Sequence, residues 1–169
     1  MKSKITLLAI LAITLVGTGV AFGDSSTGSV SLKAEVTSIA ELTLGSAVID
    51  FPATNPSTVS IPGSATTTVT ANVRTGSTGT PASLVAVGTN LTSASDTILI
   101  SNVTSSYTGD AGFFTTPGTP IAMATTPVTV GSGNTSGSWT GAFTWALANS
   151  WTYANGSYTA TISYTLTAP

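Results

Sequence analysis

The chain contains no cysteine and no histidine among its 169 residues. A Ser-His or Cys-His nucleophile, a histidine-bound metal and a disulfide are therefore excluded within one chain. Paired carboxylates are the remaining route to catalysis, and Asp96 and Asp110, in adjoining loops, are the obvious pair. Aspartates in loops rich in Ser, Thr and Gly are also ordinary turn residues, and no calcium-loop spacing accompanies them. We expect no catalytic residue and no cofactor, and we assign no metal site, although a calcium site built from Asp96, Asp110 and loop carbonyls stays open as an alternative.

Charge is scarce, and positive charge is the scarcest. Only 6% of the residues are charged, four of them basic and six acidic. Lys2 and Lys4 lie in the N-terminal leader. Without them the chain has two basic residues, Lys33 and Arg74, and six acidic ones, which gives a net charge of −4. Two separated cations cannot form the basic face that nucleic acid or an anionic membrane surface requires. A surface of Thr, Ser and Gly suits a protein that packs against copies of itself or is held on a cell surface.

The leader holds the one long apolar run. Lys2 and Lys4 precede an apolar stretch over residues 5–16, and residues 21–23 (Ala-Phe-Gly) form a small-x-small cleavage site. This pattern predicts a signal peptide at residues 1–23 and a single domain at residues 24–169, located outside the cytoplasm, secreted or on the cell surface. A retained anchor is the alternative, but no stop-transfer pattern follows, so we expect no membrane span after cleavage.

The most regular alternation lies near the C-terminus, in two stretches, residues 138–147 and 157–167. One parity is apolar, and its members are Trp139, Gly141, Phe143, Trp145 and Leu147, then Tyr158, Ala160, Ile162, Tyr164 and Leu166. A period of two predicts strands with one buried face and one solvated face. The connection containing Asn155 and Gly156 predicts that the two strands pair as an antiparallel hairpin at the centre of the core.

Shorter alternating or apolar runs fill the rest of the chain and end at Gly or Pro. They predict strands at residues 29–37, 40–44, 47–51, 59–61, 65–75, 84–87, 98–100, 102–108, 121–123 and 128–130. Outside the leader, no window has the apolar spacing of a helix. This spacing of short strands predicts an all-β domain, an antiparallel β-sandwich with immunoglobulin-like, Greek-key connections.

Two aromatic residues, Trp151 and Tyr153, lie in the loop between the C-terminal strands, where core packing does not obviously require them. Exposed aromatic rings can stack on the C–H faces of a sugar, so these two residues are candidate glycan-binding residues. The alternative, which we favour, is that Trp151 folds back as a lid over one end of the sandwich, because tryptophan is usually well buried.

The N-terminal strand is a candidate for self-assembly. Its alternating apolar residues are Val30, Leu32, Ala34 and Val36, and a short polar stretch, residues 24–28, precedes them. Such a segment can leave its own sheet and complete that of a neighbour, with main-chain bonds giving affinity and alternate side chains filling pockets. The competing possibility is an ordinary edge strand paired within its own domain.

Both ends of the chain resemble known surface proteins. Residues 29–51 (SVSLKAEVTSIAELTLGSAVIDF) resemble the opening strands of spore-coat-protein-U-like and chaperone–usher pilins, and residues 156–169 (GSYTATISYTLTAP) are similar to their last strand. Residues 141–151 (GAFTWALANSW) are similar to part of Gram-positive wall-binding surface domains. The pilins usually carry a disulfide in their first strands, which this chain lacks. The resemblance implies a secreted subunit that polymerises or coats the cell, with no catalytic residues.

The residues and the resemblance together predict an exported structural protein, pilin-like or a coat subunit. It would act through contacts with copies of itself or with other surface proteins, and not as an enzyme. The alternative is a carbohydrate-binding or adhesive module that uses the loop aromatics.

Overall fold

Two antiparallel sheets hold the alternating segments, in a computed structural model that describes residues 29–45, 48–75, 80–94, 96–110, 112–114 and 118–169. The sheets belong to the unit Glu35–Pro169, and the preceding residues form a separate unit. The predicted signal peptide, residues 1–23, lies outside the described residues. In the part of the chain that is described, no helix is long and apolar enough to cross a bilayer.

The described elements are short strands and one turn of 3₁₀ helix. They are β1 (Ile39–Leu44), β2 (Ser60–Pro62), β3 (Thr67–Arg74), β4 (Ala82–Gly88), β5 (Leu91–Thr92), β6 (Thr97–Ile98), η1 (Ile100–Asn102), β7 (Val103–Gly109), β8 (Ile121–Ala122), β9 (Val128–Gly133), β10 (Gly137–Ala148) and β11 (Ile162–Thr167). Most of them begin and end within a few residues of the predicted runs, because Gly and Pro interrupt the alternation at their ends.

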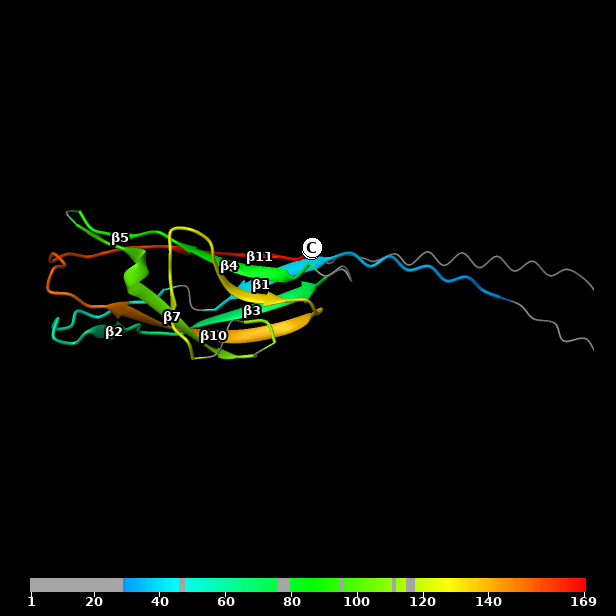
Figure 1. The fold of residues 1–169 in the computed structure, drawn as a ribbon, viewed down its shortest axis with the longest axis horizontal. Helices are drawn as coiled ribbons and strands as arrows, with labels where there is room; N and C mark the ends of the chain where they lie inside the picture. The colour runs from blue at the N-terminus through cyan, green and yellow to red at the C-terminus, as the bar shows by residue number, and fades with distance from the viewer. Residues whose placement is uncertain (1–28, 46–47, 76–79, 95, 111, 115–117) are drawn as a thin grey trace, which may run out of the picture. The chain divides into compact units, whose positions relative to one another are not determined.

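The larger sheet has the order β1-β3-β10-β7-β8, and β2 pairs with the last residues of β10. The smaller sheet has the order β11-β4-β9, and β5 and β6 form a separate ribbon. Figure 1 shows β4 and β11 in one layer and β3 and β10 in the other. Buried side chains from both sheets form one core. The predicted antiparallel β-sandwich is therefore confirmed, while its immunoglobulin-like, Greek-key connectivity stays a prediction.

The predicted hairpin between the two C-terminal strands is wrong. β10 pairs with β3 on one edge and with β7 on the other, whereas β11 pairs with β4 in the opposite sheet. Both edges of β10 are therefore occupied, and the connection after Ala148 crosses between the sheets. The predicted faces are nevertheless right, since Phe143, Trp145 and Leu147 are buried and the Thr residues between Trp139 and Trp145 are exposed.

Two predicted strands are absent. Residues 29–38 belong to no strand, and neither do residues 48–51, while Ala47 lies outside the described residues. A strand needs a partner for its main-chain groups, and alternation alone does not supply one. Within residues 48–51, Asp50 instead exchanges two hydrogen bonds with a loop residue: the Asp50 N–H donates to Ser64 Oγ at 2.9 Å, and the Ser64 N–H donates to the Asp50 carbonyl at 2.8 Å.

Phe143 of β10 lies at the centre of an aromatic cluster that joins the sheets. Its ring centroid is 5.8 Å from that of Tyr107 on β7, 5.9 Å from that of Phe114 and 6.3 Å from that of Tyr164 on β11. Gly141, two residues earlier on the same face, leaves room for this cluster, because a Cβ at that position would overlap the ring of Tyr107. The centre of the core thus depends on one small residue beside large rings.

Trp145 is the other anchor of the core. Its indole Nε1–H donates to Thr67 Oγ1 at 3.0 Å, and both side chains are buried. The hydrogen bond joins β10 to the start of β3 and satisfies a donor that would otherwise be desolvated without a partner.

We expect Trp145→Ala to lower the free energy of unfolding by about 3–5 kcal/mol, as for other large core aromatics reduced to alanine. Thr144→Ala, one position away on the exposed face, is expected to change it by less than about 0.5 kcal/mol. Urea denaturation of both variants checks the assignment of the faces, and equal shifts of the two midpoints would contradict it.

Candidate functional site

The N-terminal residues proposed for self-assembly are exposed. The exposed fraction is 86% for Val30, 89% for Leu32 and 71% for Val36, and Ala34 is also exposed. Their segment, residues 29–38, belongs to neither sheet, so it is not the ordinary edge strand that was the competing possibility. All four alternating apolar side chains are therefore exposed.

The last strand, β11, has a strand partner on one side only. It pairs with β4, and no strand among the described residues pairs with its other edge. The Thr89 N–H donates to the Thr161 carbonyl at 2.9 Å, so Thr161 directs its main-chain groups toward the β4 side. In an antiparallel ladder, successive residues direct these groups to alternate sides. The groups that point away from β4 are those of Ala160, Ile162, Tyr164 and Leu166. We call these four residues the open edge.

Three side chains of the open edge, those of Ile162, Tyr164 and Leu166, face the core but are incompletely covered, and Ala160 is exposed. On β4, the inward residues Ala82, Leu84 and Ala86 are at most 1% exposed. On β11, Ile162, Tyr164 and Leu166 pack on the same core and remain half-buried. The two strands are neighbours in one sheet, so the difference arises from position, because β4 has a strand on both sides, whereas β11 has a strand partner on one side only among the described residues.

The terminal strand of the other sheet on this side, β1, is also largely exposed. β1 lies beside β11 across the core, and it is the terminal strand of the larger sheet. Its residues are exposed except for Leu42, which is half-buried. On this side of the sandwich the core is therefore bounded by two terminal strands, with partly exposed apolar side chains between them.

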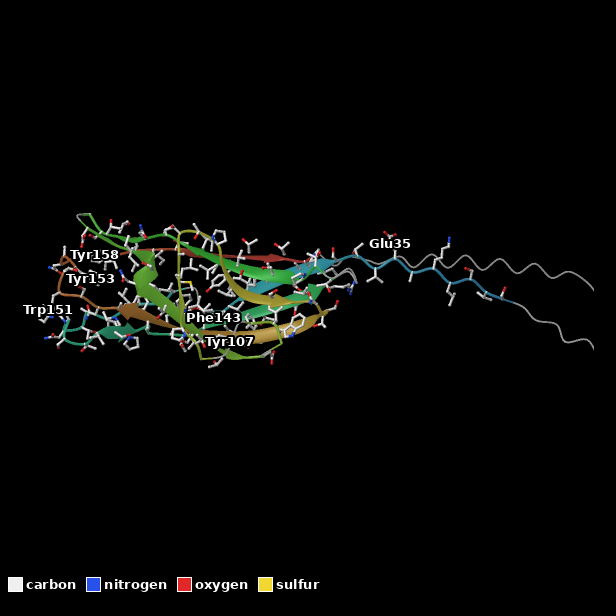
Figure 2. All side chains as sticks on the ribbon, in the orientation of Figure 1. Glu35, Tyr107, Phe143, Trp151, Tyr153 and Tyr158 are labelled. Carbon is white, nitrogen blue, oxygen red and sulfur yellow. The ribbon has the colours of Figure 1, made fainter. Side chains whose placement is uncertain are left out.

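The two loop aromatics, Trp151 and Tyr153, differ in burial. The Tyr153 ring is half-buried against the core, its hydroxyl donates to the Ala148 carbonyl at 2.9 Å, and burial raises its pKa. Trp151 is 74% exposed, so it does not fold back as the lid that we favoured. Tyr153, and not Trp151, packs on the end of the sandwich, because its hydroxyl can donate a hydrogen bond to the end of β10. Figure 2 shows both residues at the same end of the sandwich.

Asp96 holds two loops together near Trp151. Its carboxylate accepts hydrogen bonds from the Thr97 N–H at 2.8 Å, the Tyr158 hydroxyl at 2.9 Å and the Ala154 N–H at 3.0 Å. These bonds stabilise the ionised carboxylate and lower the pKa of Asp96, with the bond from Ala154 contributing most. The sequence offered no signal for the contacts with Ala154 and Tyr158, because these residues are 58 and 62 positions away from Asp96.

The two candidate catalytic carboxylates do not meet. Asp110 Oδ2 accepts from the Thr140 N–H at 2.9 Å, in the first half of β10, whereas Asp96 binds the loop that follows the end of β10. Each carboxylate has a main-chain donor that explains its place in the fold. Among the described residues, no group of three or more His, Cys, Asp or Glu side chains is placed to hold a metal ion.

No family model, curated protein or solved structure matches the chain. The resemblance to pilins and wall-binding domains therefore remains a prediction, and the function is argued from the site alone.

We expect Asp96→Asn to lower stability at neutral pH, because the asparagine cannot supply the charge that strengthens the three hydrogen bonds. The folded pKa of Asp96 is lowered, so its contribution is fully present above the ordinary carboxyl value of 3.8 and is lost as pH falls through the lower folded value. Urea midpoints measured from pH 7 to pH 2 should therefore converge for the two proteins at the acid end. Tyr158→Phe, which removes one of the three donors, is expected to lie between them at pH 7. A constant difference across this range would contradict the assignment.

Proposed function

We propose that this protein is an exported structural subunit that polymerises by strand addition. In this proposal the N-terminal segment of one copy, residues 29–38, pairs with the open edge of β11 in another copy. Two observations support the proposal. The half-buried core residues of β11 lie on a strand whose other edge has no strand partner among the described residues. The same chain has an exposed N-terminal segment whose apolar residues alternate with the same period, and this segment could cover those core residues.

The two halves match in length and in register. The donor residues from Val30 to Val36 and the open edge from Ala160 to Leu166 each span six residue steps, about 20 Å. Antiparallel addition, the arrangement of every sheet in this fold, pairs Val30 with Leu166, Leu32 with Tyr164, Ala34 with Ile162 and Val36 with Ala160. In this register the donor's apolar side chains face the core, and the paired main-chain groups face each other.

The energetics favour pairing over solvation. Burial of Leu32 and each of the two valines would contribute roughly 1.5–3 kcal/mol, before the entropy of ordering the segment is subtracted. The donor residues include no proline, so each can donate its N–H to the acceptor strand. Edge strands that stay monomeric usually carry protective charges, and here no charged residue follows Asp110 in the chain. The open edge therefore has no protection against pairing.

A pair of matched variants tests the proposal. Leu32→Asp places a charge on the inward face of the donor, where burial opposes it, whereas Ser31→Asp places the same charge on the outward face. We expect light scattering to show polymers for the parent and for Ser31→Asp, and a loss of at least ~10-fold in polymerisation rate for Leu32→Asp. A synthetic peptide of residues 24–36 should cap the open edge and stop growth.

Two results would contradict strand addition. One is a strictly monomeric parent at high concentration, unchanged by deletion of residues 24–36. The other is equal polymerisation by Leu32→Asp and Ser31→Asp, which would mean that the inward face of the segment has no role in assembly.

The exposure of Trp151 favours a second candidate function, carbohydrate binding. A ring that is 74% exposed in a loop can stack on a sugar. In this function Tyr153 would not be a second stacking surface. Its hydrogen bond to the Ala148 carbonyl would hold the loop that carries Trp151.

For this second function, we expect Trp151→Ala to abolish binding on a glycan array and to leave the far-UV circular dichroism spectrum unchanged. Tyr153→Phe keeps the ring but loses the hydrogen bond to Ala148 that holds the loop, so it should weaken binding less than Trp151→Ala does. Glycan binding that is insensitive to Trp151→Ala would exclude this residue as the sugar platform.

A further inference from the structure

The Trp151 loop and the start of β1 lie at opposite ends of the sandwich. β10 begins beside Val73 and ends beside Ser60, and Trp151 follows three residues after its last residue. At the first end, Ile39 pairs with Arg74, the neighbour of Val73. The 12 residues of β10 separate the two ends by about 37 Å. One copy of the domain therefore cannot bring Trp151 near Arg74.

The Trp151 end presents an apolar surface that is held in place. Trp151 is 74% exposed and Val59 is 78% exposed. The Asn149 N–H donates to the Val59 carbonyl at 2.9 Å, which fixes the two loops that carry these side chains. Because Asp96 also holds Ala154 in the Trp151 loop, this surface is ordered before any partner binds.

The opposite end carries a shallow, open cleft on the outer side of β1, β3 and β10. Its lining includes Ile39, which is 45% exposed, Arg74 and Ser138. Glu41 also lies in this lining, and its carboxylate accepts a hydrogen bond from Asn72 Nδ2 at 3.1 Å. Arg74 is the only cationic residue after Lys33 in the chain, so it is the only guanidinium that an aromatic ring could meet in this unit.

Strand addition brings these two surfaces together between copies. When Val36 of the donor lies opposite Ala160 of the acceptor, the same antiparallel count places the donor's Ile39 opposite the acceptor's Ser157. Ser157 lies in the connection that carries Trp151, next to Tyr158.

On this basis, which rests on the proposed function, we propose that Trp151 of one copy docks in the Arg74 cleft of the copy whose N-terminal segment it has accepted. The indole would lie against Ile39 and under the Arg74 guanidinium, in a cation–π contact beside the Glu41 carboxylate. The interface joins different surfaces of the two copies, so it repeats along an open filament and does not close a ring of two. It would set how rigidly successive subunits are held.

Cysteine cross-linking tests this contact cleanly, because the chain has no cysteine of its own. Thr152→Cys and Ser138→Cys place one thiol beside Trp151 and one beside the cleft, and leave Trp151 and Arg74 intact. We expect mild oxidation of the polymer to give a ladder of covalent oligomers. The control pair, Thr152→Cys with Thr144→Cys, puts the second thiol in the middle of β10 and should give no ladder.

Substitutions of the two docking residues then identify the contact. Trp151→Ala or Arg74→Gln, each added to the Thr152 and Ser138 cysteine pair, should slow the ladder ~10-fold while light scattering still shows polymers. Polymers without a ladder, or a ladder insensitive to Trp151→Ala, would overturn the docking contact and leave strand addition standing. Absence of polymers before oxidation would overturn strand addition itself, and the docking contact with it.

Discussion

The central constraint in this fold is that β10 has no free edge. It pairs with β3 along its first half, with β7 along its second half, and with β2 at its end. A strand that leaves β10 cannot turn back and pair with it, although the two C-terminal segments follow each other in the sequence. The chain therefore crosses to the other sheet, where β4 accepts β11. That crossing makes β11 a terminal strand, and the open edge is its direct consequence.

A terminal strand with a half-covered inner face is stable here because the core on its other sides is well packed. β4 contributes fully buried residues, and the Phe143 cluster reaches Tyr164 from the opposite sheet. Burial raises the pKa of Tyr164, because the charged phenolate would be desolvated there even though the strand is at the edge. The domain can thus keep β11 in position without a strand on its outer edge. Strand addition would complete a core that is already largely formed.

The scarcity of charge determines which kind of contact the proposed assembly can use. The unit Glu35–Pro169 has a single cation, Arg74, and no charged residue follows Asp110. Networks of salt bridges cannot specify the order of subunits in such a chain. The proposed assembly can instead use main-chain hydrogen bonds, alternate apolar side chains and the contact of one guanidinium with an exposed indole. These interactions depend little on ionic strength, and the assembly should share that property.

The sequence by itself determined the strands and their faces, because a period of two is a local property that each segment carries wherever it pairs. The burial of Phe143, Trp145 and Leu147 and the half-burial of Ile162, Tyr164 and Leu166 follow the predicted parity. Only the tertiary structure decided which strands are neighbours, since pairing joins residues far apart in the chain, such as β10 with β3. The hairpin was therefore wrong although both of its strands were right. The same reason explains Trp151 and Asp96, whose exposure and hydrogen bonds depend on loops that the sequence does not place together.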